Sequence, residues 1–297
     1  MAVAQSPENG SADDPTVLRM VLGGQLRRLR ERRGISREKA GWEIRSSESK
    51  ISRMELGRVG FKERDVADLL TLYGVADAEE REALVTLARQ ANQPNWWNRY
   101  GDVLPNWLQS YLGLETAATI IRSYEVQFVA GLLQTPGYAR AVISLGHGTA
   151  SAEEIDRRVA LRIERQKILD RENAPRMWAV IDEAALRRPI GGADVMREQI
   201  DALITASKRP NVQIQLLPFE VGGHAAAGGA YTILRFADRE LPDVVYIEQL
   251  TGALYLDKRD DVDHYAITME RLCMEAAPPE ETVRRLAELK RSAYPEG

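Results

Sequence analysis

The stretch from Gly34 to Gly57, GISREKAGWEIRSSESKISRMELG, predicts two short helices joined by a sharp turn. Its first glycine ends the helix before it, and Ser36 is then a favourable N-cap for a helix that runs to about Glu43. Ser47 is a second cap, and another helix follows over residues 48–56. The final glycine closes this helix, because glycine readily adopts the left-handed conformation that follows helix ends.

The second of these helices has a narrow apolar side and a short polar outer side. Ile51 and Met54 are its inward positions. The outward positions are Glu48, Ser49, Ser52 and Arg53, with Lys50 near the N-terminus. The major groove of DNA is wide enough to admit a helix of this kind.

This stretch and the residues before it resemble the lambda-repressor-like (XRE-type) family of helix-turn-helix DNA-binding domains. The resemblance implies that Arg30 and Glu55 form a partly buried ion pair, which holds the first helix against the recognition helix. It also implies a homodimer on a double-stranded DNA operator, because two-fold sites are the rule for this motif. The residues that carry it are Arg30, Gly34, Ile35, Ser36, Ala40, Ile51 and the run RMELG at 53–57.

The same resemblance assigns the DNA contacts residue by residue. Arg53 suits a base contact because its guanidinium can donate two hydrogen bonds to guanine O6 and N7. Glu48 leaves two interpretations open, either acceptance from a cytosine amino group or a plain preference for acidic residues at a helix N-terminus. The base-reading set is Ser47, Glu48, Ser49, Lys50 and Arg53, and the phosphate-binding set is Ser36, Arg37, Arg58 and Lys62.

Charge is distributed unevenly along the 297 residues. The formal net charge is −4, yet residues 17–62 carry 13 Lys or Arg against 5 Asp or Glu, while residues 63–297 carry a net −9. A basic module joined to an acidic body is typical of a nucleic-acid-binding protein with a separate control domain. The length is that of about two domains.

Cysteine and histidine are too sparse for a disulfide framework or a zinc site. The chain has one cysteine, Cys273, and three histidines that lie far apart in the sequence. It has no signal-peptide pattern and no apolar run long enough to cross a membrane. We therefore expect a soluble cytoplasmic protein without a metal or cofactor.

Composition divides the chain into four segments. They are a disordered tail (1–16), a five-helix helix-turn-helix domain (17–92), an aromatic-rich linker (93–105) and an α+β regulatory or interaction domain (106–297). The linker holds Trp96, Trp97 and Tyr100 but only one basic residue, Arg99. This composition favours a hydrophobic clasp between domains or subunits over a stacking platform for nucleic-acid bases.

Periodicity supplies the remaining elements. Apolar residues at helical spacing predict further helices at 16–33, 62–73, 77–90, 136–145, 151–171, 193–207, 262–275 and 280–292. Runs of β-branched and aromatic residues predict strands at 119–124, 177–181, 212–217, 231–236, 244–247 and 253–256. Short turns between the later strands indicate an antiparallel meander, so the second domain is expected to be α+β with a mainly antiparallel sheet.

A second resemblance covers nearly all of the chain beyond residue 106. The run GLLQT at 131–135, DEAAL at 182–186 and QIQLLPF at 213–219, together with Tyr111 and Glu115, resemble the actinobacterial two-part regulators. In these a repressor-like helix-turn-helix is fused to a large domain whose biochemical role is not settled. The resemblance implies an antitoxin-like pairing with a small partner protein encoded nearby.

No motif in the large domain predicts catalysis. The glycine-rich loop at 222–229 opens no helix and lacks a following Lys-Ser or Lys-Thr, so it is not a phosphate-binding loop. No serine or cysteine nucleophile lies in a known motif, and we expect no enzymatic activity. Two roles remain open, a small-molecule sensor and a protein-interaction platform. The candidate residues for a ligand or partner pocket are Trp97, Asp182, Glu183, His224 and Glu248.

Overall fold

A computed structural model describes residues 15–237 and 241–295. The chain forms two compact units. The first unit holds the described residues up to Asn98 together with Gln109–Ala117 and Leu241, and the second unit holds the others. The disordered tail expected at 1–16 lies outside the described residues, apart from Pro15 and Thr16, which begin a helix. The domain boundaries expected at residues 92 and 105 stay a prediction.

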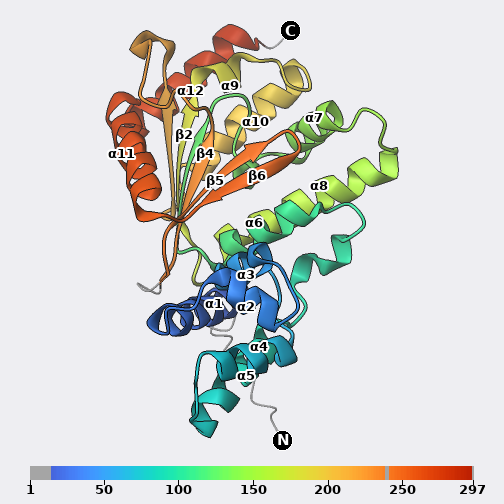
Figure 1. The fold of residues 1–297 in the computed structure, drawn as a ribbon. Coiled ribbons are helices and arrows are strands. Elements are labelled where there is room, and N and C mark those ends of the chain that lie inside the picture. Colours follow the sequence, from blue (N-terminus) through green and yellow to red (C-terminus); the bar gives the residue numbers. More distant parts are fainter. Residues whose placement is uncertain (1–14, 238–240, 296–297) are drawn as a thin grey trace, which may run out of the picture. The chain divides into compact units, whose positions relative to one another are not determined.

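Five helices form most of the first unit (Figure 1). Helices α2 and α3 begin at the serine caps expected from the sequence, and Asp77 caps α5. Their apolar sides meet in one core that includes Leu22, Leu26, Ile51 and Met54. The helices are α1 (Pro15–Arg32), α2 (Arg37–Glu43), α3 (Glu48–Glu55), α4 (Glu63–Leu72) and α5 (Ala78–Ala91).

Glycines allow α1 to approach the end of α3 closely. A Cβ atom on Gly23, in the middle of α1, would collide with the carbonyl oxygen of Met54 and would lie 2.7 Å from that of Glu55. Gly57, which follows α3, has φ +65°, and a Cβ there would lie 2.7 Å from the backbone nitrogen of Met20. The two helices therefore pack backbone against backbone, with no room for side chains between them.

Two elements after α5 were not predicted as helices. A 3₁₀ turn, η1 (Trp96–Tyr100), occupies the aromatic stretch, where the rings of Trp96 and Trp97 meet edge to face with centroids 5.5 Å apart. Helix α6 (Asn106–Ala117) follows, and the close approach of Gly113 to Thr16 fixes its second half within the first unit. The sequence gives little periodic signal for α6 because apolar residues occur on most of its sides.

The second unit is built on one six-stranded sheet with the order β3-β2-β1-β4-β5-β6. Strands β1, β2 and β3 run parallel, whereas the β1–β4, β4–β5 and β5–β6 pairs are antiparallel. The sheet is thus mainly antiparallel and the expected meander is confirmed, but the parallel half was not foreseen. The strands are β1 (Ile120–Glu125), β2 (Arg176–Asp182), β3 (Val212–Leu217), β4 (Tyr231–Arg235), β5 (Val244–Gln249) and β6 (Gly252–Leu256).

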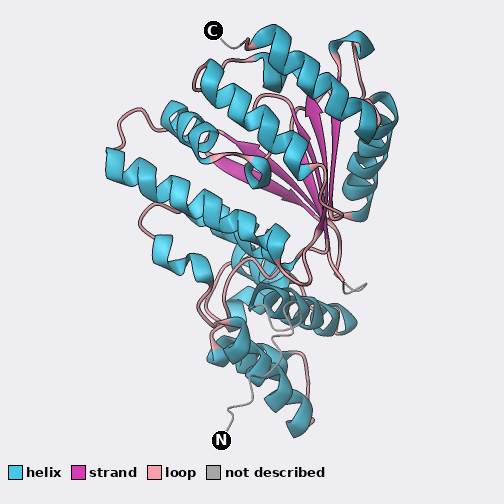
Figure 2. Ribbon diagram, turned by 180° about the vertical axis from the view of Figure 1, so that it is seen from behind, coloured by secondary structure: helices cyan, strands magenta, loops and turns pink. Residues whose placement is uncertain are grey.

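Helices cover both faces of this sheet (Figures 1 and 2). Helix α11 (Arg259–Glu275) lies on one face, where Met269 and Leu272 pack on Tyr124, Val180 and Ile233. The opposite face, seen in Figure 2, is covered by helices that include α10 and α12. The other helices are α7 (Pro136–Gly146), α8 (Ala152–Gln166), α9 (Glu183–Arg187), α10 (Ala193–Ala206) and α12 (Pro279–Ala293), with 3₁₀ turns η2 (Gly131–Leu133), η3 (Lys167–Asp170) and η4 (Phe219–Val221).

These helices confirm the α+β class and correct two details. The single helix expected at 151–171 ends at Gln166, and a 3₁₀ turn follows it. The short α9 was missed because five residues carry too little periodicity to reveal a helix. No described helix has the length and apolar character that a membrane-spanning segment requires.

The GLLQT run at 131–135 has a structural role, because it connects neighbouring helices by hydrogen bonds. Gln134 donates to the carbonyl of Val129 at 2.7 Å and accepts from Arg162 of α8 at 2.8 Å. Thr135 caps α7, and its backbone N–H donates to the fully buried Gln199 of α10 at 2.8 Å. The run therefore joins three helices through buried and half-buried hydrogen bonds, which explains its residue types without a ligand.

We predict that Gly23→Ala lowers the free energy of unfolding by about 1–3 kcal/mol, because overpacking must push α1 away from α3. The neighbouring Gly24 is the matched control, since a Cβ there meets no atom within 4 Å. Gly24→Ala should be neutral or stabilising by up to about 1 kcal/mol, because alanine favours helix. Urea unfolding followed by circular dichroism measures both variants. Equal stability of the two would contradict the close packing.

Candidate nucleic-acid interface

The outer side of α3 is exposed on a rigid support. Glu48, Ser49 and Arg53 are exposed, whereas Ile51 and Met54 on the inner side retain only 1% of their surface. The hydrophobic contacts of the inner side thus fix the direction in which the outer side chains point. Within the described residues Arg53 makes no ion pair or hydrogen bond through its guanidinium, which leaves its donors free.

The two serines expected to contact DNA also act as helix caps. The Ser36 hydroxyl oxygen accepts from the backbone N–H of Lys39 at 3.1 Å, and that of Ser47 accepts from the N–H of Lys50 at 3.2 Å. A hydroxyl that accepts one bond can still donate its own proton. Both serines are exposed, so each can cap its helix and donate to a phosphate or a base at the same time.

Lys50 has a role that the sequence did not suggest. Its Nζ donates to Asp65 Oδ2 of α4 at 2.7 Å, and the two side chains are 26% and 13% exposed. This ion pair ties the recognition helix to α4. The pairing could not be read from the sequence, because fifteen residues separate the two partners and only the packing of α3 on α4 brings them together.

A buried carboxylate gathers two arginines at the end of α3. Glu55, whose side chain is 2% exposed, accepts from Arg30 Nη2 at 3.1 Å and from Arg37 Nε at 2.9 Å. Arg30 also donates to the carbonyl of Ile35 at 2.8 Å. The hydrogen bonds that Arg30 donates to Glu55 raise the pKa of Arg30 above its ordinary value. Arg37, expected at a phosphate, is therefore partly engaged inside the domain.

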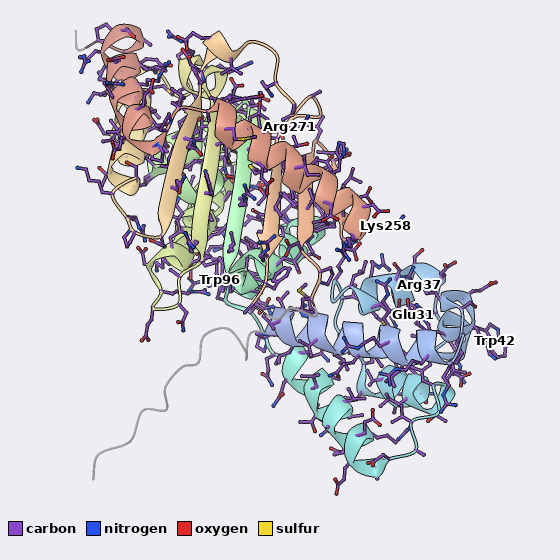
Figure 3. The ribbon with its side chains drawn as sticks, turned by 90° about the vertical axis from the view of Figure 1, so that its left-hand side faces the viewer. Glu31, Arg37, Trp42, Trp96, Lys258 and Arg271 are labelled. Atoms are coloured by element: carbon purple, nitrogen blue, oxygen red, sulfur yellow. The ribbon has the colours of Figure 1, made fainter. Side chains whose placement is uncertain are left out.

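The other expected phosphate contacts lie around the recognition helix. Lys62 precedes α4 and is exposed, with no partner within the described residues. Arg58 follows α3 and is half-buried. Trp42 of α2 was not singled out from the sequence, yet 81% of its surface is exposed and it points into solvent (Figure 3). Ala40 and Ile44 are both buried, and the spacing of these two apolar residues in the sequence could have indicated that Trp42, midway between them, faces outward.

The candidate pocket residues do not form one site. Trp97 is buried in the first unit. Asp182 and His224 do come together in the second unit, on either side of the Tyr124 hydroxyl, at 3.4 Å from Asp182 Oδ2 and 3.0 Å from His224 Nε2. Glu183 is buried, and its two carboxylate oxygens accept from the N–H of Phe219 and from Arg187.

The hydrogen bonds in this polar cluster determine which atom carries each proton. The N–H of Ala226 donates to His224 Nδ1 at 3.3 Å, so Nε2 carries the proton and donates to the Tyr124 oxygen. Tyr124 then donates to Asp182. Burial, and then the Asp182 carboxylate, raise the pKa of Tyr124 above its ordinary value, so its proton is retained. The cluster joins the ends of β1 and β2 to the glycine-rich loop.

Glu248 lies elsewhere, near Glu125 at the end of β1. Burial, and then the Glu248 carboxylate, raise the pKa of Glu125 to about 8, although Arg165 and Arg162 act to lower it. Glu248 itself accepts from the Tyr246 hydroxyl at 3.1 Å. The half-buried Glu125 is thus a carboxyl group that holds its proton near neutral pH, which no pattern in the sequence indicated.

The fold and the exposed side of α3 define a helix-turn-helix DNA-binding protein with a second α+β unit. Residues 21–84 match the family described as "Helix-turn-helix domain". Residues 108–288, more than half of the chain, match the family described as "Domain of unknown function (DUF5753)", and the chain belongs to this family. No curated protein and no solved structure matched the chain.

We predict that Glu55→Gln lowers the free energy of unfolding by about 3–5 kcal/mol, because buried Arg30 loses its buried carboxylate and keeps only the half-exposed Glu31, at 3.4 Å. Arg30→Met combined with Glu55→Gln should recover part of this loss. Glu63→Gln is the control, since Glu63 and its partner Arg89 are both about half exposed. That variant should unfold like the wild type. Denaturant unfolding tests all three, and a double variant no better than Glu55→Gln alone would show that the pair does not interact.

A second prediction concerns pH. The pKa of Glu125 is about 8 in the folded chain and close to 4.5 in the unfolded chain, so the folded state holds the proton more tightly. The stability associated with this group is fully present below the unfolded pKa and is lost as pH rises through about 8. Between pH 5 and pH 9 the Glu125→Gln variant should therefore lose less stability than the wild type. Parallel pH profiles of the melting temperature would refute the shifted pKa.

Proposed function

We propose that this protein is a sequence-specific transcriptional regulator of the XRE type, a repressor that binds a two-fold DNA operator as a homodimer in the cytoplasm. The observation that carries the proposal is the exposed side of α3, where Glu48, Ser49 and Arg53 project from a buried support. A helix held in this way can enter the major groove and present its side chains to base edges.

The roles of the individual residues follow from their surroundings. Arg53 is the main base-reading residue, because its guanidinium is exposed and free to donate to guanine. Ser47, Glu48 and Ser49 contact neighbouring bases. Phosphate binding is assigned to Ser36, Arg58 and Lys62. Arg37 also contributes, through the guanidinium nitrogens other than the Nε that contacts Glu55. Lys50 supports the helix through Asp65 and contributes positive potential beside the bases.

For the second unit we propose control by a small partner protein. The resemblance to two-part regulators supports this, and so does one edge of the sheet. Strand β6 ends the strand order, and Leu254 on it is 46% exposed, while Leu250 in the turn before it is fully exposed. A strand edge flanked by exposed leucines can accept a strand from a partner. The second unit then acts as an antitoxin-like interaction module without enzymatic activity.

A small-molecule sensor is the second candidate role for this unit. One observation favours it, a groove of about 870 Å³ beside the sheet, which is within the size range of ligand pockets. The two roles can be separated by native mass spectrometry of the purified protein. A bound small molecule supports the sensor, and capture of the neighbouring small protein when the two are co-expressed supports the interaction module.

We predict that Arg53→Ala weakens operator binding by about 1–3 kcal/mol and relaxes base preference, because two hydrogen bonds to a base are lost. Lys62→Ala should instead weaken all duplexes alike and reduce the slope of log affinity against log salt by about 1. Titrations of an operator selected from random DNA, and of a scrambled duplex, at several salt concentrations distinguish the two effects.

The matched control is Arg259→Ala, which removes the same charge from a side chain of α11 that is 92% exposed. It should change neither affinity nor preference. If Arg53→Ala kept both the affinity and the base preference of the wild type, α3 would not be the recognition helix. If the full chain showed no preference among duplexes at moderate salt, the proposed regulatory function would be wrong.

A further inference from the structure

The groove in the second unit lies at the amino ends of the three parallel strands. Its floor is formed by Ile120 and Arg122 of β1, Trp178 of β2 and Gln213 of β3, and the last turn of α11 with Met274 forms one wall. Residues from the start of α12 complete it. This end of the sheet is separate from the carboxyl end, where Asp182, Tyr124 and His224 lie.

Two apolar side chains at the groove remain exposed to solvent. Leu272 of α11 is fully buried on the sheet, but Met274, two residues later, is 77% exposed. Trp178 is only half-buried, although the next residue on the same face of its strand, Val180, is fully buried. The apolar surface of Trp178 and Met274 is therefore left at a concave part of the surface, where a ligand can cover it (Figure 3 shows α11 along this face).

Arg122 places a positive charge in the floor of this groove. In the sheet it lies opposite Trp178 of β2 and Ile233 of β4. Its guanidinium carbon is 5.3 Å from the centre of the Trp178 ring, and its Nη2 is 3.8 Å from Cys273 Sγ. Its Nε is buried without a hydrogen-bond partner, and Arg122 forms no salt bridge within the described part of the chain.

Arg122 is half-buried, and a cationic group that is partly removed from water without an anionic partner is costly, so natural proteins usually pair it. Within the described residues, the interactions of its guanidinium are with the face of the Trp178 ring and with the weakly accepting sulfur of Cys273. Of the other two arginines that line the groove, Arg235 of β4 is already paired with Asp243 at 2.8 Å, and Arg176 at the start of β2 is exposed to solvent. The unpaired guanidinium therefore favours a ligand that brings its own negative charge.

The walls of the groove are held rigidly. The Trp178 indole N–H donates to Gln215 Oε1 at 2.8 Å. Gln215 in turn donates to the carbonyls of Cys273 and Ala277, both at 3.1 Å, so it joins β3 to the end of α11 and to the residues before α12. Because these bonds fix the ring before any ligand arrives, a ligand that stacks on it loses little free energy to ordering of the protein.

We propose that this groove binds a small organic monoanion, in which a carboxylate or similar acidic group on an apolar body pairs with Arg122 while the apolar body covers Trp178 and Met274. Two exposed carboxylates, Glu270 and Glu280, also line the groove. They oppose ligands that carry several negative charges, such as phosphate-rich molecules or nucleic acid. The inference concerns binding by the second unit and is independent of the proposed contacts of α3 with DNA.

Isothermal titration calorimetry of the full chain tests the proposal with four probes. Decanoate supplies the monoanion with an apolar body, decan-1-ol the same body without charge, decylammonium the opposite charge, and inorganic phosphate the anion without the body. We expect decanoate to bind at least tenfold more tightly than any of the other three. Binding of phosphate or decan-1-ol as tight as that of decanoate would overturn the proposal.

Arg122→Met keeps the length of the side chain and removes its charge, and we expect it to weaken decanoate at least tenfold while leaving decan-1-ol unchanged. Arg271→Met is the matched control, because Arg271 is an exposed residue of α11 that does not line the groove, and its loss changes the net charge equally (Figure 3). Decanoate should bind that variant like the wild type. Equal weakening in both variants would mean that only overall charge attracts the probe.

A second variant covers the case in which Arg122→Met does not fold. Gln213 lies in the same row of the sheet as Arg122, with Trp178 between them, and it is half-buried at the groove. Gln213→Glu offers Arg122 an internal carboxylate and repels an external one, so decanoate affinity should fall at least tenfold. Unchanged decanoate affinity in a folded Gln213→Glu variant would refute binding in this groove.

Discussion

The carboxylate of Glu55 is the point on which the first unit depends. It lies at the end of α3, almost fully buried, and it holds guanidinium groups from α1 and α2 at once. A single anion shared between two cations is satisfied only when all three helices are in place. The recognition helix is therefore fixed at its C-terminal end by charge, while its inner side is fixed by Ile51 and Met54.

Close backbone packing completes this arrangement. Gly23 and Gly57 remove the side chains that would keep α1 from α3, so the ion pair closes across a short distance. Lys50 and Asp65 hold the other side of α3 against α4. Among the residues that the structure describes, the Arg53 guanidinium has no partner, whereas Lys50 and Glu55 of the same helix form ion pairs inside the domain. One short helix thus has a firm support and also a side chain available for DNA.

In the second unit one sheet carries polar groups at both ends, for different reasons. At the carboxyl ends of the parallel strands, Tyr124, Asp182 and His224 satisfy one another through a chain of hydrogen bonds. At the amino ends, Arg122 has no such chain. Its row in the sheet provides a tryptophan and a glutamine but no carboxylate. The difference between a satisfied and an unsatisfied buried polar group separates a structural cluster from a candidate binding site.

The sequence by itself determined the local structure of this protein. Serine caps, glycine stops and apolar spacing act over a few residues, so α2, α3 and most later helices and strands could be located from them. The same signals marked Arg53 as an outward residue of α3. They did not indicate α6 or α9, where periodicity is absent or too short.

Only the tertiary structure decided how these elements meet. The parallel pairing of β1, β2 and β3, the bond from Lys50 to Asp65 and the position of Glu248 beside Glu125 all join residues that are distant in the chain. So does the groove around Arg122, where strands, α11 and α12 converge. A pattern of residue types records which side of an element is buried, but it does not record which other element buries it.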